Sequence, residues 1–175
     1  MTIVPLFFLG CGQSNNDSDE HSKIEGWETF SDADYSIQYP ADWTLNNQGS
    51  MGTSFFIFAP LDKESNQFRE NINLLIQDLS GLNLDLDSYV KISEEQIEKL
   101  VSNLKMFESS RKKANGSEFH KFVYDGSQGV LKLHIKQYVW LKDEKAYILT
   151  YTTEQTQKDK HEDLSEKIMS SFSFN

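Results

Sequence analysis

The strongest constraint on the fold is a hairpin near the C-terminus whose two faces are both apolar. Residues 130–141 and 146–153 are rich in β-branched and aromatic side chains, and the Lys-Asp-Glu-Lys segment between them is typical of a tight turn. A two-residue loop in that turn predicts which side chains face each other across the strands. On one face Trp140 pairs with Tyr147 and Tyr138 with Leu149, and on the other Val139 pairs with Ile148 and Leu141 with Ala146. Neither apolar face can be left in water, so the hairpin needs a covering layer on each side.

Two amphipathic segments can supply these layers. Residues 87–104 carry apolar side chains at helical spacing, at Val90, Ile97, Val101 and Leu104, with charged side chains at other positions. The Ser93 to Gln96 segment has the spacing of a capping box, which allows a break in this helix near Ser93. Residues 159–171 form the second candidate helix, because Leu164 and Ile168 lie on one stripe.

Shorter alternating segments predict further strands at 35–39, 43–45, 54–58, 71–79, 105–114 and 117–124. The expected fold class is α+β. It is an α/β/α sandwich around a mostly antiparallel sheet of about six to eight strands, with one helix packed on each face. Residues 24–175 are expected to be one domain, long enough to fold without a disulfide or a metal ion.

The N-terminus carries the only cysteine of the chain, Cys11, at the end of the apolar run 3–9. The small residue Gly10 directly before it resembles the lipobox of bacterial lipoproteins, in which the leader is removed and the cysteine is acylated. This resemblance implies a signal or lipoprotein leader at 1–10, a polar tether at 11–23 and a lipid anchor on Cys11. Acyl chains add about 0.8 kcal/mol of membrane affinity per buried methylene group.

The lipobox pattern is incomplete at two positions. Phe8 stands where leucine is usual, Leu9 stands where a small residue is usual, and no basic residue precedes the apolar run. The alternative is that residues 3–9 form a buried strand and that Cys11 is a core thiol.

The charge of the chain limits its partners. A net charge of −10 argues against nucleic acid, because binding to phosphates depends on Lys and Arg side chains. The basic cluster Arg111-Lys112-Lys113 is short and lacks interleaved aromatic residues, which is typical of a solvated hairpin tip. The absence of cysteines other than Cys11 excludes disulfide frameworks and thiolate metal sites.

Three segments, in this order along the chain, resemble the PsbP-like family. They are residues 30–43, which end in Tyr-Pro-Ala-Asp-Trp, residues 71–76 with the helix start after them, and residues 146–152 with the helix and the segment 168–172 after them. The resemblance covers residues 27–174. It implies the α/β/α sandwich of the photosystem II subunit PsbP and of a Ran-binding nuclear import factor. It implies no catalytic residues, and many bacterial members of the family are secreted proteins or lipoproteins.

His120 and His134 are the one pair of residues that could begin a metal site. If residues 125–129 form the turn between two strands, His120 lies opposite His134 and Glu118 lies opposite Lys136. Imidazole and carboxylate groups are ligands of zinc and copper. A slip of one residue in register would place the histidines on opposite faces, and Lys136 would neutralise Glu118. We therefore expect neither a metal site nor a cofactor.

The sequence contains no recognisable nucleophile-and-base pair or phosphate-binding loop, so we expect no enzyme activity. The expected function is that of a non-catalytic lipoprotein domain of the bacterial cell envelope, anchored to a membrane through Cys11. It would act as a protein-binding or assembly module for an unknown envelope partner, and the acidic residues within 17–42 would face a basic partner surface. The alternative is a periplasmic small-molecule or metal-binding domain that uses the Trp140, Tyr147 and His134 side of the sheet.

Overall fold

The computed structural model describes residues 24–61 and 68–175, so the expected leader, the tether and Cys11 lie outside the described residues. In chain order the elements are β1 (Trp27–Ser31), β2 (Tyr35–Pro40), β3 (Thr44–Asn46), η1 (Ser50–Gly52), β4 (Phe55–Phe58), β5 (Asn71–Asp78), α1 (Leu86–Leu100), β6 (Ser102–Ala114), β7 (Ser117–Gln128), β8 (Leu131–Lys142), β9 (Lys145–Glu154), η2 (Gln155–Gln157), α2 (Glu162–Ser170) and β10 (Ser173–Phe174).

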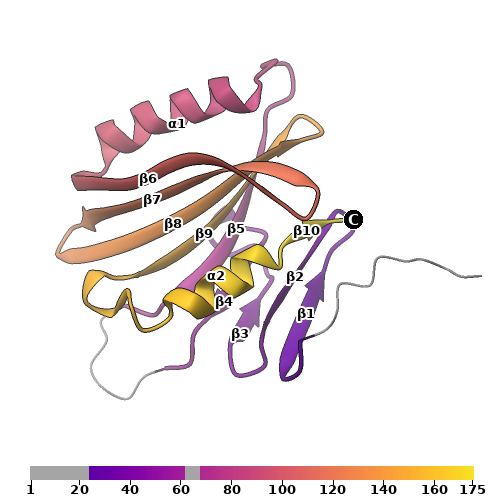
Figure 1. The fold of residues 1–175 in the computed structure, drawn as a ribbon, viewed down its shortest axis with the longest axis vertical. Coiled ribbons are helices and arrows are strands. Elements are labelled where there is room, and N and C mark those ends of the chain that lie inside the picture. The colour runs from indigo at the N-terminus through magenta and orange to yellow at the C-terminus, as the bar shows by residue number, and fades with distance from the viewer. Residues whose placement is uncertain (1–23, 62–67) are drawn as a thin grey trace, which may run out of the picture.

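These described elements form two sheets and two α-helices (Figure 1). The larger sheet has seven strands in the order β3-β4-β5-β9-β8-β7-β6, and every neighbouring pair is antiparallel. The helices α1 and α2 cover its opposite faces. The expected α+β sandwich is confirmed. A second sheet, β1-β2-β10, was not anticipated, and it contains the strand expected at 35–39.

The register of the β8–β9 hairpin is the one that its sequence predicts. Trp140 lies opposite Tyr147, and Val139 lies opposite Ile148. Asp143 and Glu144 form the two-residue loop, both with positive φ, as in the turns that match the twist of a tight hairpin. Successive side chains therefore enter different hydrophobic clusters on the two faces of the sheet.

The two faces are covered to different extents. On one face, α2 and the β1-β2-β10 sheet seal a large aromatic core around Tyr35, Trp140 and Tyr147. On the other face, only Tyr89 and Val90 are buried among the fifteen residues of α1. The α1 side is therefore the less completely packed of the two.

Two expectations about α1 need correction. The helix ends at Leu100 and not at residue 104, because Val101 adopts extended backbone angles and Leu104 already belongs to β6. It also runs through Ser93 without a break. The Ser93 hydroxyl donates a hydrogen bond to the carbonyl oxygen of Tyr89 one turn earlier, and Asp85 caps the N-terminus of the helix instead.

The turn expected at residues 125–129 is also wrong. β7 continues to Gln128, which pairs with Leu131, so the loop consists only of Gly129 and Val130. Gly126 lies inside the strand for a different reason. A Cβ atom at this position would come 2.3 Å from Cγ1 of Val101, so only glycine lets the end of α1 approach the sheet this closely.

This close approach predicts the effect of Gly126→Ala. The added methyl group should overpack against the branched side chain of Val101 and lower the free energy of unfolding by about 1–3 kcal/mol. Val101→Ala removes the obstructing methyl groups, so the double variant should lose less than the sum of the two single losses. Urea denaturation of the four proteins measures this coupling. A Gly126→Ala variant as stable as the wild type would contradict the proposed contact.

Candidate functional site

The histidine pair of the sequence analysis does not form. The two-residue β7–β8 loop places His120 opposite Val139 and His134 opposite Asp125, so the two imidazoles lie on opposite faces of the sheet. Lys136 pairs with Val123 and not with Glu118. Among the described residues, no three His, Cys, Asp or Glu side chains are grouped so that they could hold a metal ion.

His120 belongs to a small polar cluster between β6, β7 and α1. Its Nε2 lies 2.8 Å from the hydroxyl oxygen of Ser109, and that hydroxyl donates to Glu94 over 2.5 Å. Burial, followed by the charge of Arg111, lowers the pKa of His120, so the ring is neutral at pH 7. The serine proton is directed to Glu94, so the ring donates to the serine. This arrangement is the reverse of a nucleophile activated by a histidine base.

The side of the sheet that carries Trp140, Tyr147 and His134 is packed. Trp140 and Tyr147 are buried in the aromatic core, and Nδ1 of His134 is paired with Asp125 at 2.7 Å. The protein's own side chains therefore fill the space around Tyr147 and most of Trp140, and Trp140 reaches a hollow only at the end of the sheet that carries the β8–β9 loop.

Lys136 is the most unusual charged residue of this face, because its side chain is only 1% exposed. Its Nζ donates to Glu162 and to Glu166, both at 2.8 Å, and the Tyr138 hydroxyl also donates to Glu166. Lys121 lies 3.3 Å from the same Glu166 carboxylate. The lysine is thus fully engaged in holding α2 to β8, and this is a structural role.

The network predicts a dependence of stability on pH. Burial alone would raise the pKa of Glu166, but the hydrogen bonds from Lys136 and Tyr138 and the charges of Lys136 and Lys121 hold it below its ordinary value of 4.5. A carboxylate whose pKa is lowered by folding stabilises the fold above its unfolded pKa, and this contribution is lost as the pH falls through the folded pKa. The wild type should therefore lose stability below about pH 4.5.

Glu166→Gln tests this dependence. The variant should be about 1–3 kcal/mol less stable than the wild type at pH 7, because it weakens charge-assisted hydrogen bonds, and its stability should change less between pH 5 and about pH 3. Glu95→Gln, on the exposed face of α1, should change stability by less than about 0.5 kcal/mol. Parallel pH dependences for the wild type and Glu166→Gln would contradict the role of this carboxylate.

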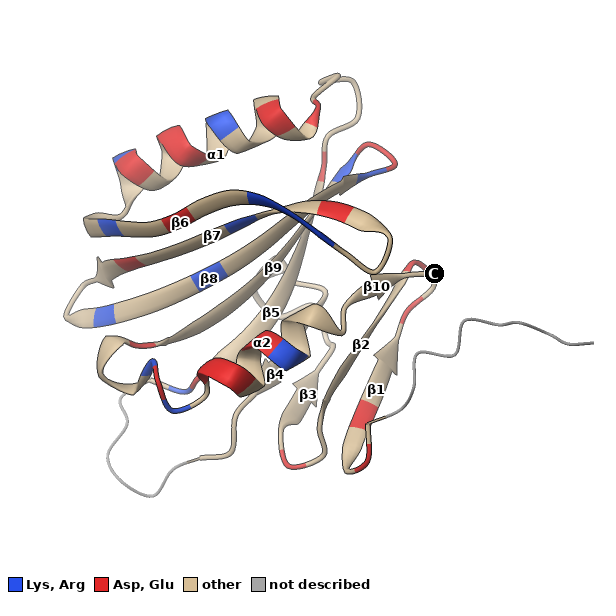
Figure 2. Cartoon of the chain, in the orientation of Figure 1, with Lys and Arg blue, Asp and Glu red and all other residues tan. Residues whose placement is uncertain are grey.

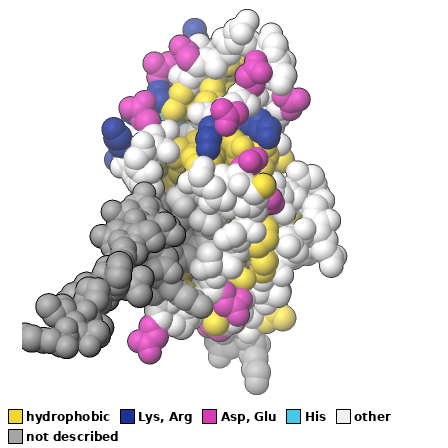
Figure 3. All heavy atoms as spheres, turned by 90° about the vertical axis from the view of Figure 1, so that its right-hand side faces the viewer, with side chains coloured by type: hydrophobic (Ala, Val, Ile, Leu, Met, Phe, Trp, Pro, Cys, Tyr) yellow, Lys and Arg dark blue, Asp and Glu magenta, His cyan; other side chains and the backbone are white. Residues whose placement is uncertain are grey.

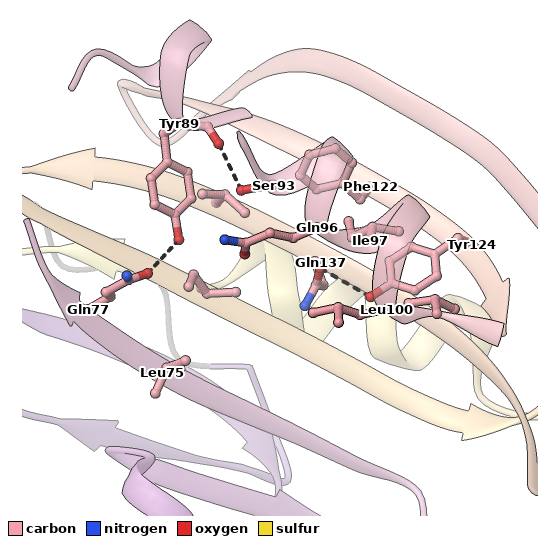
Figure 4. Close-up of a pocket in the computed structure, with 13 residues that line it drawn as sticks. Leu75, Gln77, Tyr89, Ser93, Gln96, Ile97, Leu100, Phe122, Tyr124 and Gln137 are labelled. Atoms are coloured by element: carbon pink, nitrogen blue, oxygen red, sulfur yellow. Dashed lines mark hydrogen bonds between the residues drawn. The ribbon is translucent and has the colours of Figure 1, made fainter. Parts of the chain in front are cut away.

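A groove runs between α1 and the sheet on the opposite face (Figure 4). It consists of two hollows of about 290 and 250 Å³ that share Leu100 and Val101. We call it the α1 groove. Its lining is Leu75, Gln77, Tyr89, Ser93, Gln96, Ile97, Leu100, Val101, Phe122, Tyr124, Gln137, Val139 and Ile148 in the first hollow, with Gly126, Ser127, Gln128, Leu133 and Ile135 added in the second. None of these described lining residues is charged.

The polar groups of the α1 groove are phenols and amides. The Tyr89 hydroxyl donates to Oε1 of Gln77 over 2.9 Å, and the Tyr124 hydroxyl donates to Oε1 of Gln137 over 3.4 Å (Figure 4). Burial raises the pKa of Tyr89, and that of Tyr124 to about 12, so both phenols keep their protons near neutral pH. The side-chain amide of Gln96 makes no hydrogen bond to any described residue. The groove therefore offers neutral donors and acceptors and no acid–base pair.

A second surface lies at the end of the sheet that carries the β8–β9 loop. Two hollows of about 340 and 330 Å³ meet there at Leu141 and Lys142. We call it the hairpin face, and its lining is Leu79, Asn83, Leu84, Leu86, Ser117, Glu118, Trp140, Leu141, Lys142, Asp143, Glu144, Lys145 and Phe174. Figure 3 looks onto this end of the molecule and shows hydrophobic side chains between acidic and basic ones.

Two residues of the basic cluster near the β6–β7 loop, Arg111 and Lys112, are paired with acidic side chains (Figure 2). Arg111 pairs with Asp87 of α1 and with Glu118, and Lys112 pairs with Glu108. These contacts leave little positive potential for an anionic ligand. In the part of the chain that the structure describes, neither helix is long and apolar enough to cross a membrane.

Comparison with known proteins gives a family match and several structural neighbours. A model of the PsbP-like protein family matches residues 11–174. The solution structure of the cyanobacterial PsbP of Synechocystis sp. PCC 6803 has a TM-score of 0.62 and 14% identity, with 95% of this chain and 98% of that chain covered. LpqN, involved in cell envelope biogenesis of Mycobacterium tuberculosis, has a TM-score of 0.65 and 13% identity, with 90% and 93% covered.

A more distant neighbour is the Saccharomyces cerevisiae Ran-binding protein Mog1p, with a TM-score of 0.58, 8% identity, and 84% of this chain and 94% of that chain covered. No curated protein matches the chain significantly. At these identities the structural neighbours show the fold alone.

Proposed function

Because the chain belongs to the PsbP-like protein family, we propose that it is a non-catalytic binding module of the bacterial cell envelope. A lipid on Cys11 would tether it to a membrane, and the hairpin face would bind an envelope protein. The observation that carries this proposal is the composition of the hairpin face, which joins an apolar floor to a charged rim.

The floor of the hairpin face has the properties of a protein interface. Leu86, Leu141 and Phe174 line it and are partly buried, and the ring of the buried Trp140 supports Phe174 in edge contact at 6.2 Å. Partly exposed apolar and aromatic side chains surrounded by polar residues are typical of protein interfaces.

The rim of the hairpin face carries more acidic than basic residues. Asp143, Glu144 and Glu118 line it together with Lys142 and Lys145. The β1–β2 turn adds further acids at its border, since Asp34 lies 3.7 Å from Nζ of Lys145. A partner with a basic surface would therefore associate faster at low salt.

The tether is supported by the lipobox resemblance at Cys11 and by the envelope role of LpqN, a structural neighbour. A lipidated cysteine would keep the domain beside the membrane surface, where the encounter with an envelope partner is confined to a thin layer.

Metabolic labelling with radioactive palmitate tests the anchor. The full chain expressed in bacteria should incorporate label and sediment with membranes, whereas Cys11→Ser should incorporate none, because it lacks the acceptor thiol. Equal lack of label in both proteins would contradict lipidation.

Site-specific photocrosslinking in intact cells tests the partner surface. A photoreactive residue that replaces Leu82, which is exposed beside the hairpin face, should crosslink to one partner protein and give a discrete adduct. The same photoreactive residue at Val130, which is also apolar and is more exposed (90% against 58% for Leu82), should give none at the opposite end of β8.

Charge reversal tests the role of the rim. Glu144→Lys should lower the yield of the Leu82 adduct several-fold, because it repels a basic partner, whereas Glu98→Lys on the outer side of α1 should leave the yield unchanged. Adducts of equal yield from positions 82 and 130, or an adduct that Glu144→Lys does not affect, would contradict binding at this face.

A further inference from the structure

The α1 groove has no part in the proposed partner contact, and its composition points to another ligand. We propose that it binds one hydrocarbon chain of an uncharged lipid, whose neutral polar end lies at Gln77 and Gln96. This site lies on the face of the sheet that α1 covers and is separate from the hairpin face.

The first argument is the absence of charge. A quarter of the residues in the chain are charged, yet none is among the described residues that line either hollow of the groove. A phosphate or carboxylate inside it would lose water without gaining a cation, at a cost that pairing would have to offset. A hydrocarbon chain gives up no hydrogen bonds by leaving water and gains about 25 cal/mol for each Å² of apolar surface that it buries.

The second argument is the shape of the groove. The first hollow lies beneath α1, the second lies at the C-terminal end of the helix, and the two join at Leu100 and Val101. Their floor is apolar, with Phe122, Val139 and Ile148 in one hollow and Leu133 and Ile135 in the other. Two connected apolar hollows of this size suit a flexible chain of methylene groups that can follow both.

The third argument separates a lipid chain from a peptide. Each residue of a peptide would bring a backbone N–H and C=O that need partners once they leave water. The Gln137 amide already bonds to Tyr124 and to Thr150, and Oε1 of Gln77 accepts from Tyr89. Among the amides of the first hollow, Nε2 of Gln77 and the amide of Gln96 have no hydrogen bond within the described residues, and Gln128 is the one such amide of the second hollow. These groups suffice for one ester or hydroxyl group.

Gly126 has a role in this site as well. It lets Val101 approach β7 at the junction of the two hollows, so this close contact helps to set the position of the end of α1 over the groove.

Binding of radiolabelled monooleoylglycerol, a single-chain lipid without charge, tests the proposal. The full chain with Cys11→Ser is used, so that the result does not depend on the anchor, and the lipid is kept below its aggregation concentration. Gel filtration should recover one lipid per protein. Leu100→Glu places a carboxylate where the hollows join, at a side chain that is 75% exposed, and should weaken binding at least ten-fold.

Val130→Glu is the matched control, because the same change at a 90% exposed residue outside the groove should leave binding unchanged. Thermal unfolding confirms that both variants are folded. Absence of lipid binding by the parent protein, or equal binding by Leu100→Glu, would overturn the proposal.

Two competing compounds test which chemical class of ligand the α1 groove binds. Oleoyl phosphate, with a similar chain and a charged head, should compete more weakly than unlabelled monooleoylglycerol. A capped, uncharged apolar peptide should compete more weakly still. If oleoyl phosphate or the peptide competed more strongly than unlabelled monooleoylglycerol, the assignment to a neutral lipid chain would be overturned. The absence of a photoadduct at position 82 would contradict binding at the hairpin face, and it would have no bearing on lipid binding in the α1 groove.

Discussion

The β8–β9 hairpin determines the rest of the architecture because both of its faces are apolar. Trp140 and Tyr147 require one covering layer, and Val139 and Ile148 require another on the opposite side. Two strands cannot supply these layers, so helices and a second sheet must come from elsewhere in the chain. The sandwich is the consequence, and the two layers that complete it are not equivalent.

The layer that contains α2 is fixed by both apolar and ionic contacts. Ile168 and Met169 are fully buried, and Lys136 holds two carboxylates of the same helix. The α1 layer is fixed by fewer buried side chains, Tyr89 and Val90 of the helix, and by polar contacts. Asp87 and Glu94 bind Arg111 and Ser109 of β6, and Val101 packs against Gly126 at the end of the helix. Between these contacts the helix leaves room above the sheet, which is where the charge-free groove lies.

The sequence predicts the parts of the fold that local rules decide. The β8–β9 register follows from a two-residue turn and strict alternation, and both helices follow from their periodicity. The β7–β8 turn was misplaced because Asp125 to Gly129 contains several turn-forming residues, and the reason for Gly126 is a tertiary contact with Val101. The conditional pairing of His120 with His134 fails for the same cause, since the shift of the turn places the two histidines on opposite faces of the sheet. The groove could not be predicted, because it depends on the distance between α1 and the sheet, and no residue pattern encodes that distance.

Native-state hydrogen exchange of backbone amides tests the unequal covering of the two faces most directly. The account predicts the highest protection in β8 and β9, high protection in α2, and clearly faster exchange along α1, because few of its side chains are buried. Protection of α1 equal to that of α2 would contradict the unequal covering of the two faces of the sheet.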